Sequence, residues 1–142
     1  MWLCLATCAT VAAACFPAPN SPRGVAEAFL DAQYVRIELE KARDLCRGLA
    51  RSKIEEEIEL TRDIVLDEQA RRPHVSYRLD RADESVGDGR LARYAYELTI
   101  RPPGIEPFTR LVTVSVRDEE GVWRVANFNE AESLESRLDR TR

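Results

Sequence analysis

The sequence is short of the residues from which metal and nucleic-acid sites are built. It has one histidine, and its four cysteines include no CxxC pair, so a zinc site or a redox-active dithiol is a poor fit. Basic residues are also not in excess, because 21 Lys and Arg stand against 25 Asp and Glu, for a net charge of −4. We therefore expect no metal and no cofactor, and we set nucleic-acid binding aside because no basic stripe is present.

The length and composition of the chain favour a single globular domain. A chain of 142 residues can bury a real core without help from metal or disulfides. Apolar residues make up 44% of the chain and charged residues 32%, a mixture that is typical of a folded protein rather than a disordered one.

The first fifteen residues, MWLCLATCATVAAAC, contain no charge. Their apolar run is too short for a membrane-spanning helix, which needs about 20 such residues, but it fits the hydrophobic region of a secretory signal. AAAC also resembles a bacterial lipobox, with Ala12 where leucine is usual. That resemblance implies cleavage after Ala14 and lipidation of Cys15. Cys8, which follows LAT, is a second candidate.

The segment after Cys15 is rich in proline and is typical of a semi-extended spacer (FPAPNSP). We therefore predict four parts in chain order: a signal peptide (1–14), a lipidated cysteine and tether (15–21), a folded domain (22–130) and a short frayed tail (131–142). The implied location is a bacterial cell envelope, lipid-anchored and facing the periplasm or the exterior. Three alternatives stay open: a buried N-terminal helix, a secreted protein without lipid, and a disulfide between Cys15 and Cys46.

Three amphipathic helices are expected between residues 21 and 72. Ser21 and Pro22 form a helix start, with a serine cap and a proline where no amide donor is needed. Apolar residues then recur at helical spacing along three segments: Val25, Phe29, Ala32 and Val35; Leu39, Ala42, Leu45, Cys46 and Leu49; and Ile54, Ile58, Thr61 and Val65. Gly48 indicates a break near the end of the second helix, and the third is expected to stop before Pro73.

The third predicted helix carries an acidic run, EEEIE. Four pairs of opposite charge lie four residues apart, a spacing at which exposed helix side chains pair: Arg51–Glu55, Lys53–Glu57, Asp67–Arg71 and Glu68–Arg72. We interpret the run as a solvated helix face rather than a partner site.

From His74 the apolar residues recur at every second position, the period of a β-strand. The strands are expected in four runs, VSYRL, LARYAYELTI, FTRLVTVSV and VWRVANF, separated by the turn signals GDG, PPGIEP and DEEG. Short connections join antiparallel neighbours, so the pattern predicts a four-stranded meander with one apolar face that the helices cover. The fold class is therefore α+β.

Helices followed by a curved antiparallel sheet that ends in a WRVANF-type strand resemble the nuclear transport factor 2-like superfamily. SPRGVAEAFLDAQY looks like its first helix and EKARDLCRGLA like the next, and the resemblance spans about residues 22 to 129. It implies a cone with a pocket between sheet and helices. Five aromatic residues are the candidate lining of that pocket, against the alternative that they only fill the core: Tyr77, Tyr94, Tyr96, Phe108 and Trp123.

No acid–base pair falls naturally into this pocket. His74 stands at a strand start, Asp80 has the parity opposite to Tyr77, and Asp31 lies off the apolar stripe of its helix. The sequence contains no GxSxG, HExxH or phosphate-loop motif. We therefore expect a non-enzymatic membrane-tethered module that binds a small apolar ligand or a partner protein, or forms a homodimer through the exposed sheet face. The alternatives are a small isomerase- or dehydratase-like enzyme and an accessory protein of envelope assembly.

Overall fold

The computed structural model describes residues 18–64 and 72–132. The predicted signal peptide, Cys15 and most of the predicted tail lie outside the described residues. The helical elements come first in the chain: α1 (Pro22–Leu30), the π-helix η1 (Asp31–Val35), α2 (Leu39–Asp44) and α3 (Gly48–Thr61). Four strands follow: β1 (His74–Val86), β2 (Leu91–Arg101), β3 (Phe108–Glu119) and β4 (Val122–Glu132).

A turn at residues 18–21 opens the domain. The hydroxyl of Ser21 accepts a hydrogen bond from Gly24 N at 2.9 Å and donates one to Ala18 O at 2.6 Å, which caps α1. The turn approaches the helix so closely that a Cβ on Gly24 would lie 2.1 Å from Ala18 O. Residues 18–21, predicted as the end of the tether, are therefore part of the folded domain.

The first predicted helix is built from α1 and η1 together. Val25 and Phe29 are buried, as the helical spacing predicted. After Leu30 the turns widen, and Arg36 N donates to the carbonyl of Asp31, five residues earlier, at 2.8 Å. Because five residues complete a wide turn, Phe29 and Tyr34 meet edge to face, with ring centroids 6.4 Å apart.

The boundary between α2 and α3 differs from the prediction. Gly48, expected near the end of the second helix, begins α3 with a positive φ of 53°, and Leu49 is 57% exposed. The cause lies in the backbone around Cys46, which pairs with β4: Val125 N donates to Leu45 O at 2.9 Å, and Arg47 N donates to Val125 O at 2.8 Å. The chain is extended there and cannot continue the helix.

The third predicted helix is also shorter than expected. α3 ends at Thr61, which is exposed, and its hydroxyl donates to Glu57 O at 2.8 Å. Arg62 and Asp63 form a turn, and residue 65, predicted to point inward, is outside the described residues.

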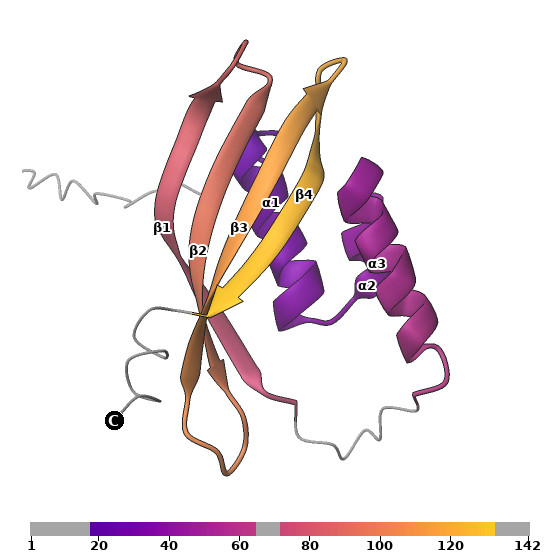
Figure 1. Cartoon of the computed structure of the whole chain (residues 1–142), viewed down its shortest axis with the longest axis vertical. Helices are drawn as coiled ribbons and strands as arrows, with labels where there is room; N and C mark the ends of the chain where they lie inside the picture. The colour runs from indigo at the N-terminus through magenta and orange to yellow at the C-terminus, as the bar shows by residue number, and fades with distance from the viewer. Residues whose placement is uncertain (1–17, 65–71, 133–142) are drawn as a thin grey trace, which may run out of the picture.

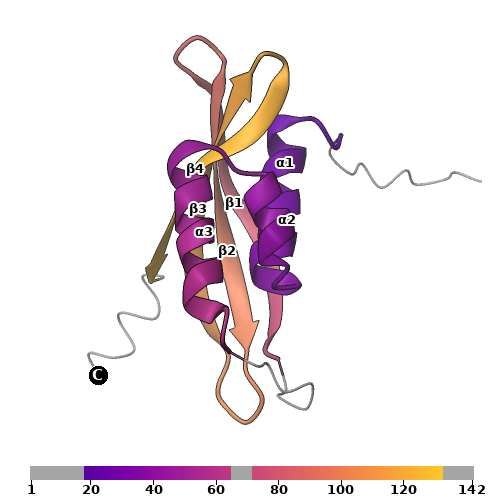
Figure 2. The ribbon, with the colours of Figure 1, turned by 90° about the vertical axis from the view of Figure 1, so that its right-hand side faces the viewer.

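The four strands form one antiparallel sheet in the order β1-β2-β3-β4, which confirms the predicted meander. The helices lie on one face of this sheet, and α3 lies along the β4 side (Figures 1 and 2). We call the face toward the helices the inner face and the opposite one the outer face. The core lies between the helices and the inner face, and its largest fully buried side chains include Phe29, Leu30, Ile54, Tyr94, Tyr96, Leu98, Val112, Val114 and Val116.

Bulges shift the alternation of side chains on the two edge strands, β1 and β4, and the register of β1 shifts again between Asp83 and Val86. Asp80 has no counterpart on β2, because Leu79 pairs with Tyr96 and Arg81 with Ala95. Ala126 is likewise unopposed, because Val116 pairs with Val125 and Ser115 with Asn127. This second bulge places Phe128 on the inner face together with Val125, although the two residues are three apart.

The ends of the sheet extend beyond the helices. The β2–β3 hairpin projects past them at one end (Figures 1 and 2). At the other end, the side-chain amide of Asn20 donates to Gly121 O in the β3–β4 turn at 3.3 Å, so the domain begins beside that turn. Ala131 and Glu132, predicted to start the frayed tail, belong to β4, which pairs Leu111 with Ala131.

Candidate functional site

Three of the five predicted pocket aromatics form one cluster on the inner face. The ring centroids of Tyr77 and Tyr96 are 5.8 Å apart at 89°, and those of Tyr94 and Tyr96 are 6.3 Å apart at 40°. The sheet register produces this arrangement. Tyr94 and Tyr96 are two residues apart on β2, and Tyr77 on β1 pairs with Leu98, the next residue of β2 that faces the helices. Tyr94 and Tyr96 are both 0% exposed, so no water-sized cavity adjoins either ring.

The hydroxyl groups of the cluster have three different environments. The Tyr94 hydroxyl donates to Glu84 Oε1 on β1 at 2.7 Å, and the Tyr77 hydroxyl donates to Glu27 O on α1 at 3.5 Å. The Tyr96 hydroxyl is buried and has no hydrogen-bond partner among the described residues. Glu84 was missed by the sequence reasoning, because the bulge at Asp80 is what turns it toward Tyr94.

Burial raises the pKa of each tyrosine in the cluster. Loss of contact with water is the main cause of the raised pKa of both Tyr94 and Tyr96. The hydrogen bond to Glu84 raises the pKa of Tyr94 further, and the charge of Glu27 raises that of Tyr96. Burial, followed by the charges of Asp31 and Glu27, raises the pKa of Tyr77. All three phenols are therefore protonated at neutral pH, so they can donate hydrogen bonds but cannot act as bases.

The other two predicted pocket residues lie elsewhere. Phe108 is 38% exposed and lies at the base of the projecting β2–β3 hairpin, with the guanidinium of Arg110 5.8 Å from its ring centroid. Trp123 is half-buried at the start of β4 and packs on the core from there. The sequence placed both on the apolar face but could not show that the strands are longer than the helices that cover them.

The three candidate acid–base residues do not join the tyrosine cluster. His74 is exposed at the first residue of β1, opposite Arg101, and Asp80 is exposed at the bulge. Asp31 forms an ion pair with Arg36 at 2.6 Å. The carboxylate that contacts the cluster directly is that of Glu84, at Tyr94.

Cys46 has a free thiol that is fully buried between α2, α3 and β4. Burial raises the pKa of this thiol to about 12, so the thiolate is scarce at neutral pH. Pairing with Cys15, which lies outside the described residues, would require the core to open around Cys46.

A second polar cluster lies where η1, α3 and β4 meet, and no part of it was predicted. Gln33 is 7% exposed, and its Nε2 donates to Glu57 Oε2 on α3 at 2.7 Å, while its Oε1 has no partner among the described residues. The Tyr34 hydroxyl donates to Glu130 Oε1 on β4 at 2.8 Å. Burial and the charge of Glu130 raise the pKa of Tyr34. The wide turn of η1 turns both Gln33 and Tyr34 toward these partners.

Lys53 joins α3 to β4 and is not paired with Glu57 as predicted. Its Nζ donates to Phe128 O at 2.7 Å and to Asn127 Oδ1 at 2.9 Å, and it lies 5.1 Å from the Phe128 ring centroid. Lys53 thus satisfies a carbonyl on the edge of β4. Of the predicted helix pairs, Arg51–Glu55 is present at 2.8 Å, and the two pairs that include residues 67, 68 and 71 fall outside the described residues.

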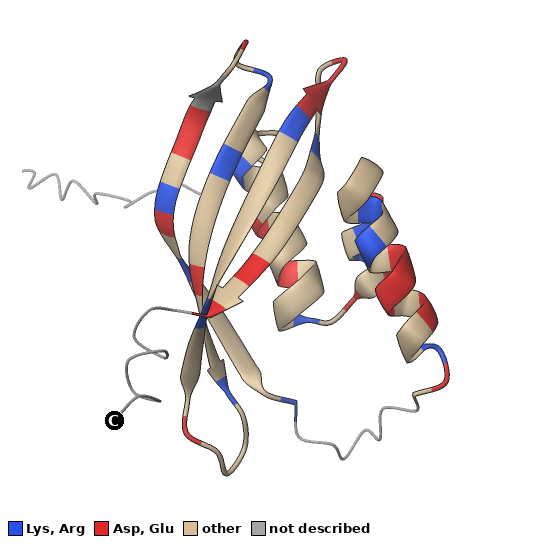
Figure 3. Cartoon of the chain, in the orientation of Figure 1, with Lys and Arg blue, Asp and Glu red and all other residues tan. Residues whose placement is uncertain are grey.

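The outer face of the sheet has an uncharged centre on neighbouring strands, which we call the outer patch: Ala95, Leu111, Thr113, Ser115 and Ala131. Charged residues of β3 are confined to its two ends (Figure 3). Glu97, which pairs with Leu111 at the border of the patch, is ion-paired with Arg78 at 3.0 Å.

Surface grooves lie between described residues. One of about 630 Å³ lies between α1, η1 and α2, and its lining includes Asp31, Arg36, Glu38 and Lys41. Within residues 18–64 and 72–132, no three His, Cys, Asp or Glu side chains are grouped so that they could hold a metal ion. No described helix has both the length and the apolar character needed to cross a bilayer.

Solved structures with the same arrangement identify the fold. A domain of unknown function with a cystatin-like fold from Nostoc punctiforme matches with a TM-score of 0.60 and 14% identity, over 84% of this chain and 80% of that chain. An NTF-2-like protein of unknown function from Shewanella oneidensis matches with a TM-score of 0.54 and 8% identity, over 76% and 93%. The chain has the nuclear transport factor 2-like fold. The predicted fold is thereby confirmed.

The remaining comparisons do not show a function for this chain. A putative calcium/calmodulin-dependent protein kinase type II association domain from Thiobacillus denitrificans matches with a TM-score of 0.61 and 11% identity, over 83% of this chain and 99% of that chain. No protein-family model and no curated protein sequence matches the chain.

Proposed function

We propose that this chain is a lipid-anchored NTF2-like domain of a bacterial cell envelope that binds a partner protein through the outer patch and catalyses no reaction. The observation that carries the proposal is the contrast between the two faces of the sheet. The inner face is closed around Tyr94 and Tyr96, which are 0% exposed, whereas the outer patch is uncharged and uncovered by any described element. Protein interfaces have a centre depleted of charge and a polar rim, which matches the patch and its surroundings.

The non-enzymatic part of the proposal is supported by the state of the titratable groups. Proton transfer needs a base within hydrogen-bond reach of a substrate proton and with a pKa near the working pH. The buried phenols have raised pKa values, and the candidate acid–base residues His74 and Asp80 are exposed outside the cluster. The description of one structural neighbour as an association domain also favours a role in association over catalysis.

Site-specific photocrosslinking in cells tests partner binding. A photoreactive amino acid at Thr113, in the outer patch, is expected to yield one defined crosslinked protein that mass spectrometry can identify. The same group at Glu56, exposed on α3, is the matched control and is expected to yield none. Equal products at both positions, or no product at Thr113, would contradict the proposal. Crosslinking of Thr113 to copies of this chain alone would replace the partner with a homodimer.

Lipid anchoring is tested separately by metabolic labelling with a fatty acid in a bacterial host. We expect the wild-type chain and a Cys8→Ser variant to incorporate label, and a Cys15→Ser variant to lose it. Labelling that survives Cys15→Ser, or is absent from all three, would remove the anchor from the proposal. Partner binding by the outer patch does not depend on this result.

A further inference from the structure

The two edges of the sheet differ in how they are covered. On β4, Val125 exchanges backbone hydrogen bonds with residues 45 and 47, and Lys53 occupies the carbonyl of Phe128. β1 is the other edge, and no described strand pairs with its far side. An unpaired edge offers a row of backbone donors and acceptors to a further strand, so β1 is the place where this sheet can be extended.

The side chains of β1 carry alternating charges along this edge. Arg78, Asp80, Arg81 and Asp83 are all exposed, in the order positive, negative, positive, negative. Arg78 pairs with Glu97, Arg81 with Ala95 and Asp83 with Arg93 on β2. Because Arg93, Ala95 and Glu97 alternate with the buried Tyr94 and Tyr96, these three β1 residues lie on the outer face.

We propose that β1 pairs antiparallel with β1 of a second copy of this chain. In the register that fits, Arg78 lies opposite the second copy's Asp83, and Asp80 lies opposite its Arg81. Read in the reverse direction, the order of these four charges is its own complement, so each of the four meets its opposite across the junction. Opposite charges directly across a strand pair stabilise it and like charges destabilise it.

The bulge at Asp80 is what makes this register geometrically consistent. In a regular strand, residues 78 and 83 would point to opposite faces, because successive side chains alternate. The extra residue at the bulge shifts the alternation by one, so both lie on the outer face. The pairing therefore joins outer residues to outer residues and inner residues such as Leu79 and Ala82 to each other.

The charges also make the edge selective. Charged side chains and bulges ordinarily protect an edge strand from arbitrary partners. On β1 the charged side chains exclude strands that lack the complementary order of charges. A second copy of β1 has that order and is not excluded. The pairing places both outer faces on the same side of one continuous sheet, and it is independent of partner binding by the outer patch.

Charge reversal on the full chain tests the pairing. The dimer dissociation constants of wild type, Arg78→Asp, Asp83→Arg and the double variant are measured by light scattering and sedimentation over a range of concentrations. By symmetry each single reversal creates two like-charge contacts, so we expect dimerisation to weaken about tenfold or more. The double variant restores opposite charges at both contacts, and we expect its dimerisation to return to the wild-type level.

Three controls keep the result decisive. The double variant lacks the Arg78–Glu97 ion pair just as the Arg78→Asp variant does, so its recovery cannot reflect that pair. Arg117→Glu, exposed on β3 of the outer face, is expected to leave dimerisation unchanged. Asp80→Arg and Arg81→Asp, alone and together, repeat the design if the first set unfolds. A monomeric wild type, single reversals without effect, a double variant without recovery, or loss of the dimer in Arg117→Glu would each overturn the proposal.

Discussion

At the scale of single residues, the tyrosine cluster contains two buried hydroxyl groups on the same strand, one with a hydrogen-bond partner and one without. Tyr94 and Tyr96 are both fully buried, and Tyr94 bonds to Glu84 while Tyr96 has no partner among the described residues. A buried polar group without a hydrogen bond lowers the free energy of unfolding by about 1–3 kcal/mol. The two residues therefore form a matched pair for mutation.

We expect Tyr96→Phe to raise the free energy of unfolding by about 1 kcal/mol, because it removes an unsatisfied hydroxyl without changing the ring. Tyr94→Phe should lower it by about 1 kcal/mol, because it removes the bond to Glu84. Urea unfolding followed by circular dichroism measures both values. A loss of stability in Tyr96→Phe equal to that in Tyr94→Phe would mean that a water molecule or another group satisfies the Tyr96 hydroxyl.

The buried thiol of Cys46 should be inert while the domain is folded. Its pKa is raised to about 12, and its side chain is inaccessible. We expect iodoacetamide at pH 8 to leave the Cys46 peptide unmodified in native protein and to modify it fully in urea, as mass spectrometry of that peptide would record. Modification at the same rate in both conditions would contradict the burial of Cys46.

At the scale of elements, α3 is held to the rest of the domain by both apolar and polar contacts. Its buried residues are Ala50 and Ile54, and polar bonds from Lys53 and Glu57 supplement them. The sequence favoured a solvated charged face for α3, and Arg51 and Glu55 fit that description. Lys53 and Glu57 do not fit it, because their partners are on β4 and η1. The spacing of charges within one helix cannot predict such contacts.

We expect Lys53→Met to destabilise the domain by about 1–2 kcal/mol, because the Phe128 carbonyl and the Asn127 amide oxygen lose their donor while the apolar stem remains. Hydrogen exchange should increase in α3 and at the edge of β4. Lys41→Met, at an exposed ion pair with Glu38, is the control and should change stability by less than about 0.5 kcal/mol. Equal effects of the two substitutions would show that Lys53 does not fasten α3.

At the scale of the whole molecule, the ionisation of the buried groups links stability to alkaline pH. Tyr34, Tyr94 and Tyr96 have raised pKa values in the folded protein, and the unfolded chain keeps the ordinary value of about 10. Above that pH the unfolded state loses protons that the folded state retains, so the unfolded state gains stability. The contribution of each tyrosine is fully present below pH 10 and is lost as the pH rises.

The free energy of unfolding should therefore fall above about pH 10, by up to about 1.4 kcal/mol per pH unit for each tyrosine that stays protonated in the folded state. Cys46, with a folded pKa of about 12, should add a decline of the same maximum slope that begins at about pH 9. Urea unfolding at a series of pH values measures the slope, and Tyr96→Phe should reduce it by one tyrosine. A slope unchanged by that substitution would mean that Tyr96 ionises alike in both states.

Hydrophobic periodicity was sufficient to predict the architecture. The alternation in residues 91–100 and 112–116 reports which face is buried, because burial on one face is what produces the pattern. The bulges at Asp80 and Ala126 and the π-helix η1 were not predictable, because each depends on pairing or packing with a distant segment. The irregular positions orient Glu84, Gln33 and Phe128 toward their partners. The polar contacts around the tyrosine cluster and at the junction of η1, α3 and β4 could therefore not be predicted from the sequence.

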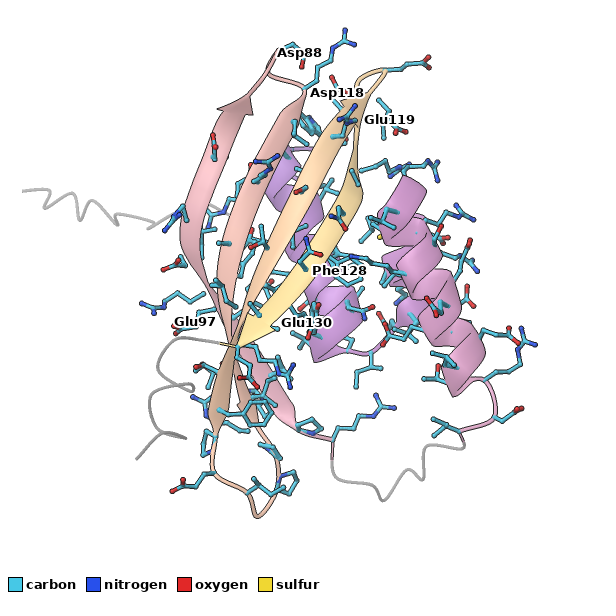
Figure 4. All side chains as sticks on the ribbon, viewed as in Figure 1. Asp88, Glu97, Asp118, Glu119, Phe128 and Glu130 are labelled. Atoms are coloured by element: carbon cyan, nitrogen blue, oxygen red, sulfur yellow. The ribbon has the colours of Figure 1, made fainter. Side chains whose placement is uncertain are left out.

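The hydrogen bond between Asn20 and Gly121 determines how the domain would stand on a membrane. With Cys15 anchored as proposed, four residues lie between it and Asn20, so Asn20 can be at most about 18 Å from the lipidated residue. Asp88 in the β1–β2 turn and Asp118 and Glu119 at the end of β3 lie at that same end (Figure 4), so they would face the lipid headgroups, and the β2–β3 hairpin would point away from them. The strands would then stand upright on the bilayer, and a binding partner would have to approach from the side, within the layer next to the membrane.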